Sequence, residues 1–452
     1  MSFHKILNMP RVFNNTLGST MNKKMSLNDL KPKAKASSYQ IVHNQFMTLL
    51  NQNKYEQGLA LLNTHLPRFP KNIALLNNIA LCHLRLRHYQ QAYDGYQKSL
   101  TIASGLDANT NLYDGLCEVC HHLDKKDEQQ QVGKLAIQTK ANLVKSVKPP
   151  AVFSGPPPPF VKAVNHGNRL ENIISFSLFG DSPRYCETAI LNVYWANLLY
   201  PDWTCRFYVD DTVPIHVLER LENSGAQIIK VSAAIKSKMS GLFWRFLVID
   251  DPTVKRYIIR DADSLVSYKE RAAVAEWTQS GQWFHTMRDY FSHTELILAG
   301  MWGGCQGAIT NIEQKIIDFL AKYKQSSNRV LDQHFLRYEI YPIIVHSVLM
   351  HDSQGFQDNA VPMPKTQDKT PHEEHPSFHI GRNIGTQRIK ITVNKQNVSH
   401  LQWALITSTG TQICHYEVAI TKENPISIYL PDAYIEKIQA KDYTVKVSFT
   451  DK

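Results

Sequence analysis

The stretch Tyr257-Ile258-Ile259-Arg260-Asp261-Ala262-Asp263-Ser264 decides how the centre of this 452-residue chain is expected to fold. Its apolar half has the composition of a buried strand, and its polar half places two aspartates one residue apart directly after that strand. Because ligands of α/β sheets gather at the carboxyl ends of the strands, we expect Asp261 and Asp263 to lie at such an edge. Two carboxylates in that position suit a divalent cation such as Mg²⁺ or Mn²⁺.

Strands and helices alternate around this stretch. We expect strands over 173–178, 204–209, 226–231 and 256–259, and helices over 185–199 and 214–223. Alternation in short units predicts an α/β Rossmann-type domain with a largely parallel sheet, which we place at residues 171–382.

The segment 40–147 has a different pattern, with apolar residues only at helical spacing. A set of small and aromatic positions recurs there after 34 residues: Tyr55, Gly58, Leu62 and Leu66 return as Tyr89, Ala92, Tyr96 and Leu100. This period resembles that of tetratricopeptide (TPR) repeats, which implies paired helices. A weaker third unit over 111–137 is out of strict register. Such an array implies either a docking surface for a protein partner or a packing module.

Three further segments complete the organisation. Residues 1–39 form a basic leader with little hydrophobic periodicity, and the Pro-rich run over 148–170 is expected to be a stiff linker between domains. Alternating apolar residues over 383–452 predict a small β-rich C-terminal module.

The formal net charge of +10 suits phosphate-bearing ligands, anionic membranes or nucleic acid. Much of the excess lies in the first forty residues, which implies either an inert tail or peripheral contact with the inner face of the plasma membrane. No nucleic-acid module is recognisable, so nucleic acid is not expected as a partner. The chain has no run of about 18 apolar residues and no secretory signal, which predicts a cytoplasmic location.

The order of several motifs between Glu171 and Gly381 resembles that of bacterial nucleotide-sugar glycosyltransferases of the GT-A fold, which take part in surface-polysaccharide synthesis. The motifs are Phe176-Ser177-Leu178-Phe179-Gly180, Tyr200-Pro201-Asp202-Trp203, Phe243-Trp244-Arg245-Phe246, Arg260-Asp261-Ala262-Asp263-Ser264 and Ala299-Gly300-Met301-Trp302-Gly303-Gly304. The resemblance implies a metal-dependent transferase that moves a sugar from a nucleotide-sugar donor, UDP-linked by default, to a glycan acceptor.

Donor-binding positions follow from the motifs and the resemblance together. Arg245, between aromatic residues, is expected to pair with a diphosphate or to brace the aspartates, and a surface ion pair is the alternative. The remaining expected donor contacts, for several of which a structural turn is the alternative, are Ser177, Leu178, Gly180, Arg260, Asp261, Gly303 and Gly304.

Asp261 and Asp263 are expected to hold the metal with His351, which ends the apolar run over 343–350 and so is predicted to lie at a strand end. His379 is the alternative ligand. Asp332 and Gln333 are predicted to contact the acceptor or the sugar, with helix capping as the alternative for Asp332.

Arg288 and Asp289 are predicted to form a donor-sugar or acceptor cluster, because sugar hydroxyls need both donors and acceptors. A second functional class remains open for the whole chain, namely a TPR-based adaptor whose glycosyltransferase-like domain is inactive. The sequence does not identify the donor sugar, the acceptor or the stereochemical outcome.

Overall fold

The computed structural model describes residues 38–103, 110–162, 171–323, 330–393, 398–420 and 424–451. The chain divides into two compact units, Met1–Thr139 and Lys140–Lys452, which are described separately. The basic leader predicted for residues 1–39 lies outside the described residues except for its end, because the first helix already begins at Ser38. No helix in the described ranges is both long and apolar enough to cross a membrane.

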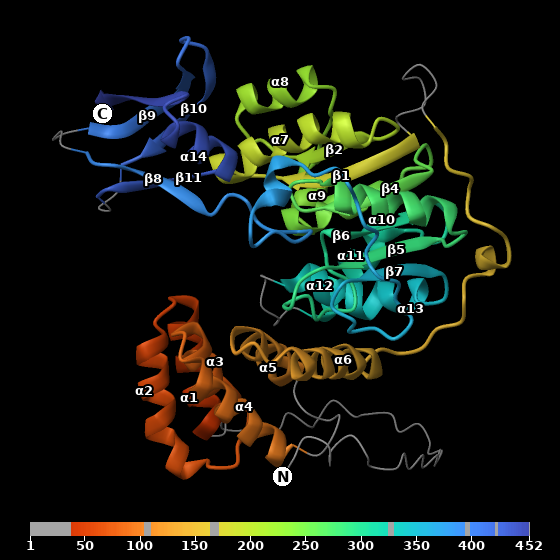
Figure 1. The fold of residues 1–452 in the computed structure, drawn as a ribbon, viewed down its shortest axis with the longest axis vertical. Coiled ribbons are helices and arrows are strands. Elements are labelled where there is room, and N and C mark those ends of the chain that lie inside the picture. Colours follow the sequence, from red (N-terminus) through yellow and green to blue (C-terminus); the bar gives the residue numbers. More distant parts are fainter. Residues whose placement is uncertain are drawn as a thin grey trace, which may run out of the picture. The chain divides into compact units, whose positions relative to one another are not determined.

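The first unit is built from paired helices (Figure 1). Successive helices pack against each other from α1 to α5. Their bounds are α1 Ser38–Asn51, α2 Tyr55–His65, α3 Ile73–Arg85, α4 Tyr89–Ile102, α5 Thr110–His122 and α6 Lys126–Asn142, of which α6 runs on past the unit boundary.

One short turn joins the two helices of each pair, and the positions of these three turns show the repeat directly. Asn53, Arg87 and Asp124 each lie at the middle of a three-residue turn, and all three have positive φ. Arg87 follows Asn53 by one 34-residue period, whereas Asp124 lies three residues beyond the next period. The first unit is therefore a TPR-like helical region whose third pair is out of register, as the sequence predicts.

The second unit contains a seven-stranded sheet of order β3-β2-β1-β4-β6-β5-β7 (Figure 1). The expected strands appear as β1 Asn172–Leu178, β2 Thr204–Val209, β3 Gln227–Lys230 and β4 Arg256–Arg260. The others are β5 Phe284–Arg288, β6 Met301–Cys305 and β7 Val348–Asp352. β6 runs antiparallel to both β4 and β5, whereas the other pairings in the sheet are parallel, so the sheet is mixed but largely parallel, as predicted.

Helices follow the strands as the α/β pattern predicts. In chain order they are α7 Pro183–Leu199, α8 Ile215–Asn223, α9 Ala233–Lys236, a 3-10 helix Gly241–Asp250, α10 Tyr268–Gln279, α11 Ile312–Lys322, α12 Leu331–Phe335 and α13 Tyr341–Ile344. The apolar run over 343–350 is not one strand as predicted, because its first residues end α13 and only β7 is extended.

The C-terminal module is β-rich, as predicted. Strands β10 Gln412–Ala419, β9 Val398–Thr407 and β12 Tyr443–Asp451 form one sheet, and β11 Ile426–Leu430 pairs with β8 Gln387–Ile391. Helix α14 covers Asp432–Gln439. Fully buried Glu187 on α7 accepts hydrogen bonds from Tyr416 at 2.6 Å and Tyr434 at 3.1 Å. These bonds fix the module to the α/β domain.

The described part of the Pro-rich run, up to residue 162, packs on the second unit. Arg256 donates to the Pro158 carbonyl at 2.7 Å, and the Trp283 indole donates to the Gly155 carbonyl at 3.2 Å. The compact units divide at Thr139 and Lys140, before this run. The Pro-rich segment therefore extends the α/β domain along its surface.

Substitution of Gly303 by alanine is expected to lower stability by about 1–3 kcal/mol, the usual cost of overpacking a core. Gly303 lies on β6, and a Cβ there would stand 2.6 Å from the Tyr257 carbonyl oxygen, a backbone atom that cannot turn aside. Urea unfolding of the variant measures the effect. Gly410, whose added Cβ would meet nothing within 4 Å but whose φ is +90°, serves as the comparison for backbone strain alone.

Candidate functional site

The carboxyl ends of β1 and β4 open onto one cavity. The two strands pair in parallel, so residues 177–179 at the end of β1 and residues 261–263 after β4 lie at the same edge of the sheet. The cavity has a volume of about 240 Å³. Its lining residues are Ser177, Leu178, Phe179, Tyr185, Leu242, Arg245, Asp261, Ala262 and Asp263.

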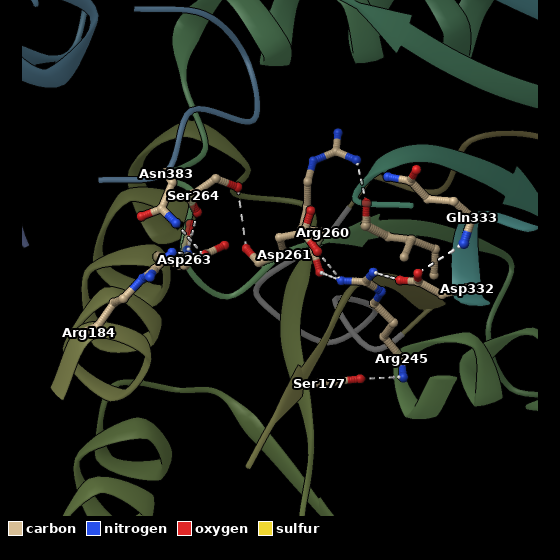
Figure 2. Close-up of polar contacts among 12 residues, drawn as sticks. Ser177, Arg184, Arg245, Arg260, Asp261, Asp263, Ser264, Asp332, Gln333 and Asn383 are labelled. Carbon is tan, nitrogen blue, oxygen red and sulfur yellow. Dashed lines mark hydrogen bonds and ion pairs between the residues drawn. The ribbon is translucent and has the colours of Figure 1, made fainter. Parts of the chain in front are cut away.

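Arg245 is the central side chain of this site (Figure 2). Its guanidinium forms an ion pair with Asp261 and donates to Asp332 at 2.9 Å, and Arg245 is only 5% exposed. Strand β1 fixes its backbone, because Ser177 Oγ accepts from the Arg245 amide at 2.9 Å and Ser175 Oγ donates to the Arg245 carbonyl at 2.7 Å. A buried cation thus joins two carboxylates from separate elements.

Asp263 has a different pair of partners (Figure 2). Arg184, in the first turn of α7, donates to Asp263 Oδ2 at 3.0 Å, and the Asn383 amide donates to the same oxygen at 2.6 Å. The amide of Ile384 also donates to the Asp263 carbonyl at 3.0 Å. The segment after Gly381 therefore helps to position Asp263 without lining the cavity itself.

Burial sets the electrostatics. It raises the pKa of Asp263 to about 6, with repulsion from Asp261 as the second cause and Arg184 opposing both. Burial likewise raises the pKa of Asp332, against the attraction of Arg245. For Arg245, burial alone would lower the pKa, but Asp261 and Asp332 outweigh it and the pKa is raised. The guanidinium therefore stays charged, while Asp263 can take up a proton at mildly acidic pH.

In the metal-free protein, the Asp263 carboxyl is expected to titrate near pH 6. Its folded pKa exceeds the roughly 3.9 of an unfolded aspartate, so this group destabilises the fold at pH 7. The destabilisation should be lost as the pH falls through 6 toward 4. Carbon-13 NMR of the aspartate carboxyls, assigned with Asp263→Asn, measures the midpoint. A midpoint below pH 4.5 would contradict the burial argument.

The residues present fit a divalent cation that arrives with its phosphate ligands. Among the described residues, side-chain donors reach only one oxygen of each aspartate, Asp261 Oδ1 and Asp263 Oδ2. Gly300 packs directly against the other Asp261 oxygen, since a Cβ there would stand 2.0 Å from Asp261 Oδ2, and the Asp261 side chain as a whole is 42% exposed. In those same residues no three His, Cys, Asp or Glu side chains form a metal cluster. Mg²⁺ is commonly held by one or two carboxylates plus substrate phosphates and water.

The side chains or backbone of three predicted donor residues lie elsewhere in the fold. Gly303 and Gly304 are on buried β6 in mid-sheet, where they make room for Tyr257 and Phe284 rather than for a sugar. Arg260 is 3% exposed and pairs with Glu270 at 2.7 Å, so its side chain is structural. Only its carbonyl, which accepts from Arg245 at 3.3 Å, belongs to the site.

For the remaining predicted donor positions, the structure agrees with the sequence prediction in part. Ser177 and Leu178 line the cavity. Gly180 does not line it but ends the turn after β1 with φ +77°, a conformation that favours glycine. Its amide donates to Thr212 at 2.6 Å.

The predicted acceptor residues separate into two groups. Asp332 contacts the site through Arg245, and its other oxygen accepts from the Gln333 amide at 2.9 Å in the first turn of α12. Gln333 contributes its backbone in this contact. The N-cap residue of that helix is Val330, so Asp332 does not occupy the capping position. Arg288 donates to the Glu295 carbonyl at 2.7 Å and Asp289 pairs with Lys269 at 2.6 Å, and both residues are buried. Neither Arg288 nor Asp289 lines the cavity.

The structure does not bring His351 to the aspartates. β7 is the edge strand, and β5 and β6 lie between it and β4. The His351 ring contacts His285 at 2.9 Å through one nitrogen and Glu276 at 2.9 Å through the other. Burial lowers its pKa. The alternative ligand, His379, stacks on Tyr290 with ring centroids 3.7 Å apart.

Several site residues carry no sequence signal that identifies them. Phe179 and Tyr185 present partly exposed rings to the cavity, at 43% and 37% exposure. Arg184 and Asn383 reach Asp263 from 79 and 120 residues away along the chain. Only the fold shows that these side chains meet.

The similar solved structures compared with this chain are TPR domains and bear on its helical region. No protein-family model and no curated protein sequence matches the chain. Solved TPR structures match about a quarter of it. The first TPR domain of Spaghetti (RPAP3), bound to an HSP90 peptide, is 16% identical over 23% of this chain and 79% of that one, with a TM-score of 0.21.

Two further TPR structures are similar to the same extent. The Sgt2 TPR domain from Aspergillus fumigatus is 12% identical over 23% of this chain and 66% of that one, with a TM-score of 0.21. The TPR protein YrrB, described as having an unusual peptide-binding site, is 19% identical over 22% and 50%, with a TM-score of 0.21. These likenesses concern the helical fold and carry no functional argument.

Proposed function

We propose that the second unit is a nucleotide-sugar glycosyltransferase whose donor site is the cavity at the ends of β1 and β4. The observation that carries the proposal is the convergence of Asp261, Asp263 and Arg245 on one cavity with two exposed aromatic rings beside it. Carboxylates suit a cation–diphosphate, and an aromatic ring suits a nucleotide base. The assignment of sugar transfer as the reaction rests on the resemblance of the sequence motifs to those of GT-A glycosyltransferases.

Each residue of the cavity has a distinct task in this proposal. Asp261 and Asp263 each offer one carboxylate oxygen to Mg²⁺ or Mn²⁺, which would neutralise the charge of the leaving diphosphate. Arg245 fixes the orientation of Asp261 and connects it to Asp332. Phe179 and Tyr185 offer faces for the base. A glycan hydroxyl is the acceptor class, and UDP is the nucleotide to test first.

Calorimetry of the full chain with UDP and Mn²⁺ tests the donor site, followed by a hydrolysis screen of UDP-, GDP- and CMP-sugars with Mn²⁺ or with chelator. Metal-dependent turnover of one donor, lost in Asp263→Ala, is the expected result. If calorimetry detects no binding of UDP, GDP or CMP, the proposal is overturned.

A second candidate is the adaptor with an inactive α/β domain. It is favoured by the fact that each aspartate already has an arginine partner, Arg245 for Asp261 and Arg184 for Asp263. In an active site those ion pairs must leave one oxygen of each aspartate available to the cation. If Mn²⁺ fails to bind even in Arg184→Met, in which Asp263 Oδ2 loses its arginine partner and keeps only the Asn383 amide, the adaptor is the better description.

A further inference from the structure

We infer that a second groove, beside Asp263, binds the acceptor as an uncharged polyhydroxyl ligand, a glycan with exposed pyranose faces. The role of this ligand as an acceptor rests on the proposed function, whereas the groove itself is defined by the structure alone. It has a volume of about 590 Å³ and lies between α7, the segment Pro371–Pro376 and α14.

The groove and the donor cavity share a wall. Ile384 and Leu265 line the groove. The Ile384 amide donates to the Asp263 carbonyl at 3.0 Å, and Ser264 forms a β-bridge with Asn383. Figure 2 shows Asn383 directly beside Asp263. A ligand in the groove is thus separated from the donor aspartates by one short backbone segment.

Asp432 provides the main sign of a missing ligand. It lines the groove at the start of α14, is 7% exposed, and uses Oδ2 to pair with Arg382 at 2.8 Å. Its other oxygen, Oδ1, is buried and accepts no hydrogen bond from any described residue. An unsatisfied buried carboxylate oxygen is costly, and a hydroxyl group from a ligand would satisfy it.

Aromatic rings form the opposite side of the groove. Tyr194 is 63% exposed, and its ring lies at 81° to the Trp195 ring, with centroids 5.2 Å apart. Trp195 in turn contacts His372 edge-on at 5.7 Å. Amphipathic rings of this kind can pack against the C–H face of a sugar while carboxylates bind its hydroxyls.

The charges favour a neutral ligand. The lining carries the carboxylates of Asp432, Glu374 and Glu436 together with the cations Arg382 and Lys437, so neither sign strongly predominates. A strongly anionic or cationic polymer would gain little here. Hydrogen-bond acceptors and donors interspersed with aromatic rings match a polyhydroxyl compound instead.

Saturation-transfer NMR on the full-length chain tests the groove, with maltotriose, cellotriose and chitotriose as probes. At least one trisaccharide is expected to bind, and both Tyr194→Ala and Asp432→Asn are expected to weaken it at least tenfold. Tyr194→Ala alters an exposed side chain and so should not disturb folding. The matched controls are Tyr429→Ala and Asp211→Asn, an exposed ring and an exposed carboxylate outside the groove.

Two results would overturn the inference: no binding by any of the three probes, or binding that both groove variants leave unchanged. UDP binding with Mn²⁺ is measured in parallel on the same samples. Groove variants that lose the trisaccharide but keep UDP support both proposals. Trisaccharide binding in a chain that binds no nucleotide supports the groove and refutes the donor site.

Discussion

Arg245→Met is expected to destabilise the protein by about 3–5 kcal/mol, the usual cost of removing one partner of a buried ion pair. The variant leaves Asp332 buried without its counter-charge, since Arg245 is that residue's ion-pair partner at 2.9 Å. It also frees Asp261 from the position in which the guanidinium holds it. Chemical unfolding with circular dichroism measures the first effect, and nucleotide binding measures the second.

Arg184→Met is the matched control for that experiment. Arg184 also pairs with an aspartate, Asp263, at 3.0 Å, but its side chain is 30% exposed against 6% for Arg245. Partly exposed pairs contribute about 0–1 kcal/mol, so this variant should stay close to the wild type. Equal losses of stability in the two variants would show that burial is not the deciding difference.

The loss of stability in Arg245→Met should also depend on pH. Because burial already raises the pKa of Asp332, this loss should shrink as the pH falls and the Asp332 carboxyl protonates.

Asp263→Asn is expected to weaken Mn²⁺-dependent nucleotide binding about a hundredfold, or about 2.7 kcal/mol, without destabilising the metal-free fold. The carboxylate is unfavourable in the unliganded protein at pH 7, because its pKa is raised to about 6. An asparagine of the same shape removes that cost and can still accept from Arg184 and Asn383. Calorimetry with UDP and Mn²⁺ and a thermal melt without metal separate the two effects.

The control for this variant is Asp211→Asn, whose carboxylate is 83% exposed and pairs with Lys236 outside the cavity. It should change neither measurement. A loss of thermal stability in Asp263→Asn larger than in Asp211→Asn would mean that the Arg184 and Asn383 contacts hold the fold together. The aspartate would then be structural, and the donor-site proposal would lose its main support.

The strands of the first half of the α/β domain were predictable because each is an apolar run that ends in polar residues. β1, β2 and β4 fall within one residue of their expected bounds. β6 was not expected as a strand, since Gly303 and Gly304 favour a turn by local propensity. Packing against Tyr257 and Phe284 reverses that preference, because only glycine fits there.

The site was predictable only where its residues adjoin the strands. Ser177 and Leu178 end β1, Asp261 and Asp263 come directly after β4, and the parallel pairing of these strands brings them together. Arg184 and Asn383 meet Asp263 through tertiary contacts that no local pattern encodes. The His351 assignment was wrong about position for a related reason. A strand end predicts an edge of the sheet, but not which neighbour the strand has.

The hydrogen bond from Asn383 to Asp263 ties the C-terminal module to the site in a way that affects domain exchange. Asn383 and Ile384 belong to the segment that leads into β8, yet both contact Asp263. A chain truncated before residue 383, or one in which a different module were grafted there, would lose two of the contacts that position this carboxylate. Recombination at that junction is therefore restricted to partners that supply an equivalent amide, and the module and the donor cavity are expected to be inherited together.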